Sequence, residues 1–423
     1  DQAINNQSLV LEEVTGAVHT YLYELLQNAN DYPYNGEDVR VKFILTDRYL
    51  FFLHTGANFD LLNIVGICGS HQGEKSKKKE TIGYKGIGFK TVFVKNDYVY
   101  LKTADWSLRF DRARSNREME CEEDEENMTP WVYMPWPTGP EELDSEVHSI
   151  IDSIAADFRV QFALRHSKDA REHIEQLDKV FGDDEILLFI PHVTDVEVTV
   201  DGRVSHHVTK DRNKWLVWSD KDPATELLKW VRNEFKNGNG GKIPPKFKDI
   251  DAVQISFAVR KDGNRIVPVE NARVYNYLPT ELRLGLPFFV NADFIPDASR
   301  SGLHPGLLWN DTVIGDCGKF FVKWFASLLE TEGEYDMESV FSIYPQVKST
   351  DHYPSLFMNN VHSETGKVAC IPATKDGEYR LLHLKDIIYD LTGLTRGENP
   401  VLTDEEFYSF CGMSGSLPHP DIR

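Results

Sequence analysis

The stretch ELLQNANDYPY, residues 24–34, gathers polar side chains in a segment that has the apolar spacing of a helix. Apolar residues recur at helical intervals from Leu9 to Leu26, which predicts one amphipathic helix over residues 8–30. Asn and Asp are mediocre helix formers because their side chains compete for backbone hydrogen bonds. A run of them beside apolar positions therefore indicates either a frayed helix end or a binding site.

Three of these polar residues, Glu24, Asn28 and Asp31, are spaced to share one face of the helix. An amide oxygen such as that of Asn28 suits Mg²⁺, which keeps several waters and takes few protein ligands. The Glu24 carboxylate can orient or deprotonate a water beside that ion. The alternative is the ordinary polar face of a surface helix.

A hairpin is expected next, because two apolar strands flank a tight turn at Asp47-Arg48. The strands are VRVKFILTD (39–47) and YLFFLHT (49–55), and a short helix, FDLLNIVGI (59–67), follows them. The second strand ends in HTGANF, where Gly56 permits a tight turn against which a flat base can lie. His54 can hydrogen-bond to a base or a sugar. A simple strand-end turn is the alternative.

A glycine-rich stretch, IGYKGIGFK (82–90), opens a helix expected near residues 87–94. Gly83, Gly86 and Gly88 allow backbone N–H groups to approach phosphates, and the start of a helix adds positive potential. Lys85 and Lys90 add charge. A glycine triplet is a weak signal alone, but here it follows the Glu/Asn helix and the hairpin in a fixed order.

The composition is that of a globular protein, with 423 residues, 41% hydrophobic and 27% charged. The net charge of −21 opposes broad nucleic-acid binding, which needs a basic surface. The five cysteines form no CxxC pair, which favours a reducing compartment and argues against a zinc site. We expect a cytoplasmic protein without a membrane span or a secretory signal.

Farther along the chain, a hairpin is expected from DYVYLKT and WSLRFD, and the acidic run at 118–126 is expected to be a solvated loop. His206-His207 is expected to lie in a strand rather than at a metal. The Gly- and Pro-rich stretch 236–246 is the clearest linker. After it come strands in AVQISFAVR, ARVYNYLP and LPFFVNADF and a long helix at 307–331. We therefore expect domains at 1–235, 236–340 and 341–423.

Together, these motifs resemble the GHKL ATPase superfamily, and within it the group of sacsin-like and NO VEIN-like proteins with their bacterial relatives. ELLQNAND is similar to the N-box, HTGANF to the first glycine motif and IGYKGIGFKTVF to the second. The likeness extends to EILLFIPHVTDVEV and YLPTELRLGLPFFVNADFIPDASR, and covers about three quarters of the chain.

The resemblance implies an α+β protein with a Bergerat-type sandwich, a mixed sheet with helices on one face, followed by a transducer-like α/β domain. Glu24 would be the general base and Asn28 the Mg²⁺ ligand. The other residues that the family pattern assigns to ATP are Asp31, His54, Gly56, Phe59, Gly83, Lys85, Gly86, Ile87, Gly88 and Phe89. Lys75, Lys77, Lys78 and Lys79 would belong to a mobile lid, for which a solvated basic loop is the alternative. Arg300, in a Ser- and Gly-rich loop, is the candidate sensor of the γ-phosphate.

Two departures from the family pattern stand out. His54 occupies the place of the usual Asp that reads the adenine amino group, and no third-motif Thr is found where we expect it, in FRVQFALR (158–165).

The expected function is Mg²⁺-dependent ATP binding and slow hydrolysis that drive lid closure. The chain would be a chaperone-like or clamp-like module of a larger protein or complex, acting on a protein client or complex subunit. Because proteins of this superfamily commonly dimerise, the resemblance also allows a homodimer. The alternatives are a nucleotide-sensing scaffold without catalysis and a DNA-directed clamp subunit, which in some bacterial relatives lies among defence genes.

Overall fold

The computed structural model describes residues 20–68, 92–120, 129–154, 157–166, 170–240, 243–297, 301–375 and 378–386. These residues form two compact units. The first takes the described residues within Asp1–Lys210 and Trp230–Ile250, and the second those within Asp211–Lys229, Asp251–Asp297 and Ser301–Arg423. Helix α8 (Thr225–Lys236) spans the division.

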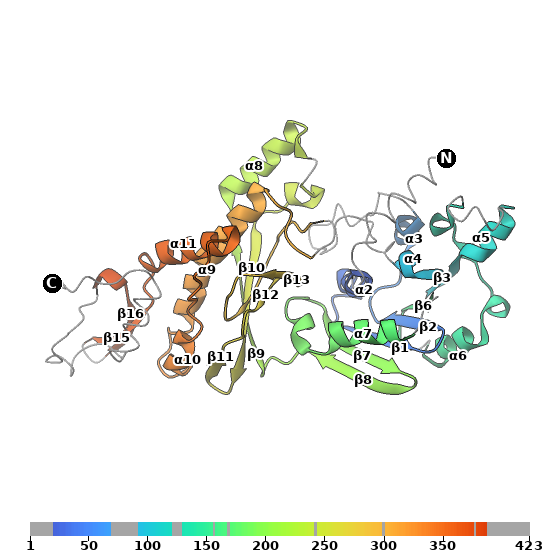
Figure 1. Cartoon of the computed structure of the whole chain (residues 1–423), viewed down its shortest axis with the longest axis horizontal. Coiled ribbons are helices and arrows are strands. Elements are labelled where there is room, and N and C mark those ends of the chain that lie inside the picture. The colour runs from blue at the N-terminus through green and yellow to red at the C-terminus, as the bar shows by residue number, and fades with distance from the viewer. Residues whose placement is uncertain are drawn as a thin grey trace. The chain divides into compact units, whose positions relative to one another are not determined.

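The first unit is built on a mixed eight-stranded sheet with the order β5-β4-β3-β6-β2-β1-β7-β8 (Figure 1). Its strands are β1 (Val39–Leu45), β2 (Tyr49–His54), β3 (Asn96–Thr103), β4 (Trp106–Asp111), β5 (Trp136–Pro137), β6 (Val160–His166), β7 (Val193–Val200) and β8 (Arg203–Thr209). Its helices are α2 (Thr20–Asp31), α3 (Leu61–Cys68), α4 (Val92–Lys95), α5 (Arg112–Glu118), α6 (Ser145–Ile154) and α7 (Ala170–Phe181), with short 3₁₀ turns η3 (Trp131–Tyr133), η4 (Pro140–Glu142), η5 (Asp184–Leu187) and η7 (Pro245–Lys248). β1 and β7 pair in parallel, and the other pairs are antiparallel.

The central strand β2 is buried along its whole length because helices cover both faces of the sheet. On one face, Phe52 packs against Phe43 of β1, which contacts Phe181 of α7. On the other face, Phe51 belongs to a cluster that includes Val147 and Ile151 of α6. The expectation of helices on one face only was therefore wrong. The unbroken apolar run of β2 is typical of a strand covered on both sides.

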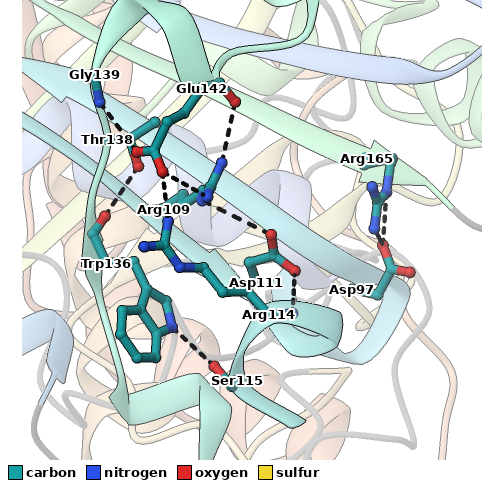
Figure 2. Close-up of polar contacts among 10 residues, drawn as sticks. All are labelled: Asp97, Arg109, Asp111, Arg114, Ser115, Trp136, Thr138, Gly139, Glu142 and Arg165. Atoms are coloured by element: carbon teal, nitrogen blue, oxygen red, sulfur yellow. Dashed lines mark hydrogen bonds and ion pairs between the residues drawn. The ribbon is translucent and has the colours of Figure 1, made fainter. Parts of the chain in front are cut away.

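A polar cluster joins β4 and the start of α5 to the segment around η4 (Figure 2). Glu142 accepts hydrogen bonds from Arg114 Nη1 at 2.9 Å, from Arg109 Nη2 at 3.4 Å and from the backbone N–H of Gly139 at 3.3 Å. The Arg114 guanidinium also lies over the Trp136 ring. Although desolvation opposes ionisation, the Gly139 N–H and the two guanidinium groups outweigh it and lower the pKa of Glu142.

The second unit has a six-stranded sheet in which β10 pairs with β9, β11 and β14. Its strands are β9 (Trp215–Asp222), β10 (Val253–Asp262), β11 (Arg265–Val267), β12 (Arg273–Asn276), β13 (Leu278–Arg283) and β14 (Phe289–Ala292), and a separate pair is formed by β15 (Ile371–Lys375) and β16 (Glu378–Leu382). Its helices are α9 (Leu308–Ser327), α10 (Met337–Phe341) and α11 (His352–Thr365), with the 3₁₀ turn η8 (Leu384–Asp386).

Aromatic side chains fill the core between this sheet and its helices. Phe257 of β10 stacks on Trp324 of α9 with ring centroids 5.2 Å apart. Helices α9 and α11 cross closely (Figure 1). The approach is so close that a Cβ at Gly318 would lie only 2.4 Å from the Phe357 carbonyl oxygen. Glycine is what permits this approach. The segment ARVYNYLP forms two strands rather than one, because Tyr277 adopts a positive φ of 63° between β12 and β13.

Several predicted elements are confirmed, among them both hairpins, the turn at Asp47-Arg48, the helix after Phe59 and the strand at His206-His207. The long helix is confirmed as α9, which ends at Ser327, a few residues before its expected end. The start of the 8–30 helix and most of the acidic run lie outside the described residues. Within the described ranges, none of the helices combines the length and apolar character that crossing a bilayer requires.

Candidate functional site

The candidate site begins with α2, whose orientation is held at both ends. Near its start, the Tyr21 hydroxyl lies 3.0 Å from Nδ1 of His173 on α7. Near its end, the Asn30 side-chain oxygen accepts the backbone N–H of His192 at 2.8 Å. Burial, and then the nearby Glu172, raise the pKa of Tyr21, so this hydroxyl stays protonated. The helix is therefore a fixed platform for the polar residues between these contacts.

The polar residues of α2 have different roles. Glu24, Asn28 and Asp31 lie in one continuous helix and so share a face, as predicted from their spacing. Glu24 is buried, whereas Asn28 and Asp31 are half-buried. Asn30, which is only 1% exposed, serves as the structural link to His192. A polar residue buried this deeply requires such a partner.

The turn after β2 is joined directly to the end of α2. The Tyr32 carbonyl, one residue beyond the helix, accepts the backbone N–H of Ala57 at 2.7 Å. A Cβ at Gly56 would lie 2.7 Å from that same carbonyl oxygen and 2.8 Å from Nδ1 of His54. The backbones therefore approach as closely as only glycine allows. Two segments that the sequence analysis singled out separately, 24–31 and 54–59, thus meet in space.

His54 stands at the end of β2 and is fully buried. Its Nδ1 accepts the backbone N–H of Gly56 at 3.2 Å. In the neutral ring this assigns the proton to Nε2, so that His54 can offer a donor where a carboxylate would offer an acceptor.

Arg159 supports the same turn from the strand side. Its Nη1 donates to the Thr55 carbonyl at 2.8 Å, and its guanidinium lies 3.8 Å from the centroid of the Tyr34 ring. Tyr34 follows α2, so Arg159 is a second connection between the helix exit and the glycine turn. Neither the Arg159 contacts nor the Tyr32–Ala57 bond has a local sequence signal, because each joins residues far apart in the chain.

Strand β6 lies beside β2, with Val160 opposite His54. It occupies the stretch where a third-motif Thr was expected, and the residue next to His54 is apolar. On the far side of Val160, β3 contributes Thr103, whose hydroxyl accepts the backbone N–H of Phe59 at 3.1 Å. Thr103 was not predicted as a site residue, since nothing in LKTAD marks it as more than a strand end.

The remaining predicted site residues lie outside the described residues. They are Gly83, Lys85, Gly86, Ile87, Gly88 and Phe89, the lysines at 75 and 77–79, and Arg300. The chain is described again from Val92 onward, where the Phe93 ring packs edge-on against Phe110 and Trp131.

Within the part of the chain that the structure describes, no group of three or more His, Cys, Asp or Glu side chains is placed to hold a metal. The two strand histidines form separate pairs, His206 with Asp178 at 2.6 Å and His207 with Asp195 at 3.1 Å.

The amino-acid sequence of the chain is similar to part of a known plant protein. No family model matches the chain. The chain is 23% identical over 394 residues to Protein NO VEIN of Arabidopsis thaliana. The match covers 85% of this chain but only 13% of the plant protein. The chain is thus similar to one part of a much longer protein.

Proposed function

We propose that the first unit binds ATP with Mg²⁺ and hydrolyses it slowly. The single observation that carries the proposal is the hydrogen bond from Ala57 to Tyr32, at 2.7 Å, which brings the helix of Glu24 and Asn28 to the glycine turn after His54. Their order along the chain agrees with the GHKL motif order, and the similarity to Protein NO VEIN supports the resemblance to NO VEIN-like proteins.

The residues present fit such a ligand. The tight turn at Gly56, where a Cβ would meet the Tyr32 carbonyl, leaves backbone rather than side chain at this point. The half-buried Asn28 offers an amide oxygen, a hard ligand of the kind Mg²⁺ accepts, on the same helix face as Glu24. A bound Mg²⁺ would neutralise phosphate charge. Glu24 would orient a water and take its proton.

The wider assignment rests on the resemblance. We propose a Bergerat-type arrangement of strands and helices for the first unit, from which α6 on the second face of the sheet is a departure, and a transducer-like role for the second unit. We also propose phosphate binding by Gly83, Lys85, Gly86 and Gly88 and γ-phosphate sensing by Arg300. The nucleotide would drive a conformational cycle in which a protein partner is held or released, so that motion limits turnover. We also propose, from the resemblance, that the chain acts as one module of a larger protein or complex.

A second candidate is a nucleotide sensor without catalysis. It is favoured by two observations: His54 stands where an acidic residue is usual, and its strand neighbour is Val160 rather than a threonine. In such a sensor, nucleotide would hold one conformation and a partner would read it.

The variant Glu24→Ala separates the two candidates. In an ATPase the variant keeps nucleotide binding and loses hydrolysis, which phosphate release measures directly. Glu37→Ala is the control, since it removes an exposed carboxylate just beyond the same helix that has no assigned role at the nucleotide. Equal, slow hydrolysis by the wild type and Glu24→Ala would contradict catalysis and favour the sensor.

A further inference from the structure

The hydroxyl of Thr103 holds the turn that follows Gly56. Thr103 is the last residue of β3 and is 1% exposed. Its hydroxyl oxygen accepts the backbone N–H of Phe59 at 3.1 Å, and its O–H donates to the Asn58 side-chain oxygen at 3.3 Å. One hydroxyl can make both bonds at once, because it has a donor and two acceptor sites.

This contact places Phe59 in the candidate site. Thr103 pairs with Val160, which pairs with His54, so the three residues form one row across β3, β6 and β2. The half-buried Phe59 ring lies 6.4 Å from the His54 ring and 6.1 Å from that of Phe162. These separations are typical of packed aromatic pairs.

The turn is fixed on either side of Phe59 as well. Before it, Ala57 donates to the Tyr32 carbonyl. After it, Asp60 and Asn63 exchange hydrogen bonds of 2.8 and 3.0 Å at the start of α3. Between these fixed points, the Thr103 hydroxyl is what orients the Asn58–Phe59 peptide.

We propose that Thr103 is a positioning residue of the nucleotide site, which acts by holding the Phe59 ring in place for the base. This inference rests on the proposed function. Aromatic faces stack on bases, and such stacking requires an ordered ring. Thr103 itself does not touch the nucleotide. Its loss should therefore affect the affinity for nucleotide more than the rate of the bound complex.

The test compares Thr103→Val, which keeps the shape and removes the hydroxyl, with Thr103→Ser, which keeps the hydroxyl. Calorimetry with MgATP should show affinity about tenfold weaker for Thr103→Val, the loss expected for one or two hydrogen bonds. Thr103→Ser should bind like the wild type, and kcat should change less than KM in Thr103→Val. Thr138→Val is the control, since it removes a buried hydroxyl that donates to the Trp136 carbonyl elsewhere in the same unit.

Hydrogen exchange gives a second readout that needs no ligand. The Phe59 amide should be protected in the wild type and Thr103→Ser and exposed in Thr103→Val, while the β3 amides stay protected in all. Wild-type affinity in Thr103→Val, or an equal loss in Thr103→Ser, would overturn the role of Thr103 alone. A folded wild type that binds no nucleotide would overturn the proposed function and this inference with it.

Discussion

The carbonyl oxygen of Tyr32 accepts the backbone N–H of Ala57 at 2.7 Å, across 25 residues of chain that include an entire β-hairpin. The bond joins the exit of α2 to the turn after β2. Because α2 is itself tied to α7 and to the segment before β7, the helix carrying Glu24 and Asn28 cannot shift without disturbing the turn at Gly56. The candidate site is therefore built on a rigid connection between distant parts of the sequence.

Gly56→Ala should break this connection. The new Cβ would meet the Tyr32 carbonyl at 2.7 Å, and backbone cannot move aside as a flexible side chain can. We expect a loss of about 1–3 kcal/mol in the stability of the first unit, the usual cost of overpacking. Chemical denaturation measures this loss of stability, and hydrogen exchange of the α2 and β2 amides shows where it acts.

Gly366→Ala is the control for this substitution. A Cβ there would meet nothing within 4 Å, so the change should stay within about 0.5 kcal/mol. If Gly56→Ala proved as stable as Gly366→Ala, the close approach between Gly56 and Tyr32 would be wrong.

Asn30→Ala should reduce the stability of the fold, and Asn28→Ala should reduce MgATP binding, although the two residues are only two positions apart. Asn30 is 1% exposed and accepts the His192 N–H, so its removal leaves a donor unpaired and should cost about 1–3 kcal/mol of stability. Asn28, which is half-buried, should be needed for MgATP binding and not for folding. Denaturation and calorimetry on both variants check the assignment. The same pattern in both variants would show that the two residues do not divide these roles.

Gly318→Ala should destabilise the second unit, because its Cβ would lie 2.4 Å from the Phe357 carbonyl and force α9 away from α11. A cost of about 1–3 kcal/mol is expected, with faster hydrogen exchange in α11. Gly315→Ala, one turn earlier, is the milder comparison, since its Cβ would meet the Asn360 side chain at 3.0 Å. Equal stability of Gly318→Ala and the wild type would argue against this helix crossing.

Glu142→Gln should make the stability of the fold less dependent on pH in the acidic range. The pKa of Glu142 is lowered in the folded protein, so its ionised form contributes stability at a pH above the ordinary pKa of a glutamate. This contribution is lost as the pH falls through the lower pKa of the folded state. Glu142→Gln should therefore be less stable than the wild type at pH 7, and the difference should vanish in acid. Denaturation midpoints across this pH range measure the effect. A pH-independent difference for Glu142→Gln would contradict the charge argument.

Local patterns in the sequence were enough to predict the hairpin of β1 and β2. The apolar run YLFFLH and the turn at Asp47-Arg48 depend on neighbouring residues alone. The helical spacing of Glu24, Asn28 and Asp31 likewise needed only periodicity. These features were predictable because the physical cause and the residues lie together in the chain.

The features that the sequence analysis missed depend on long-range pairing. Thr103 meets Phe59 only because β3 and β2 both pair with β6, and Asn30 meets His192 across 162 residues. Likewise, α6 covers the second face of the sheet through tertiary packing that its own amphipathic pattern does not specify. The break at Tyr277 is a backbone conformation that a tyrosine rarely adopts, so residue type gave no warning of it.

The most direct test of the central claim is calorimetry of the purified chain with ATP, ADP and GTP in the presence of Mg²⁺. We expect ATP to bind and Asn28→Ala to abolish this binding while leaving the fold intact. The comparison with GTP measures how far His54, as a donor, still selects adenine. A well-folded chain that binds none of these nucleotides would show that the first unit has no nucleotide site.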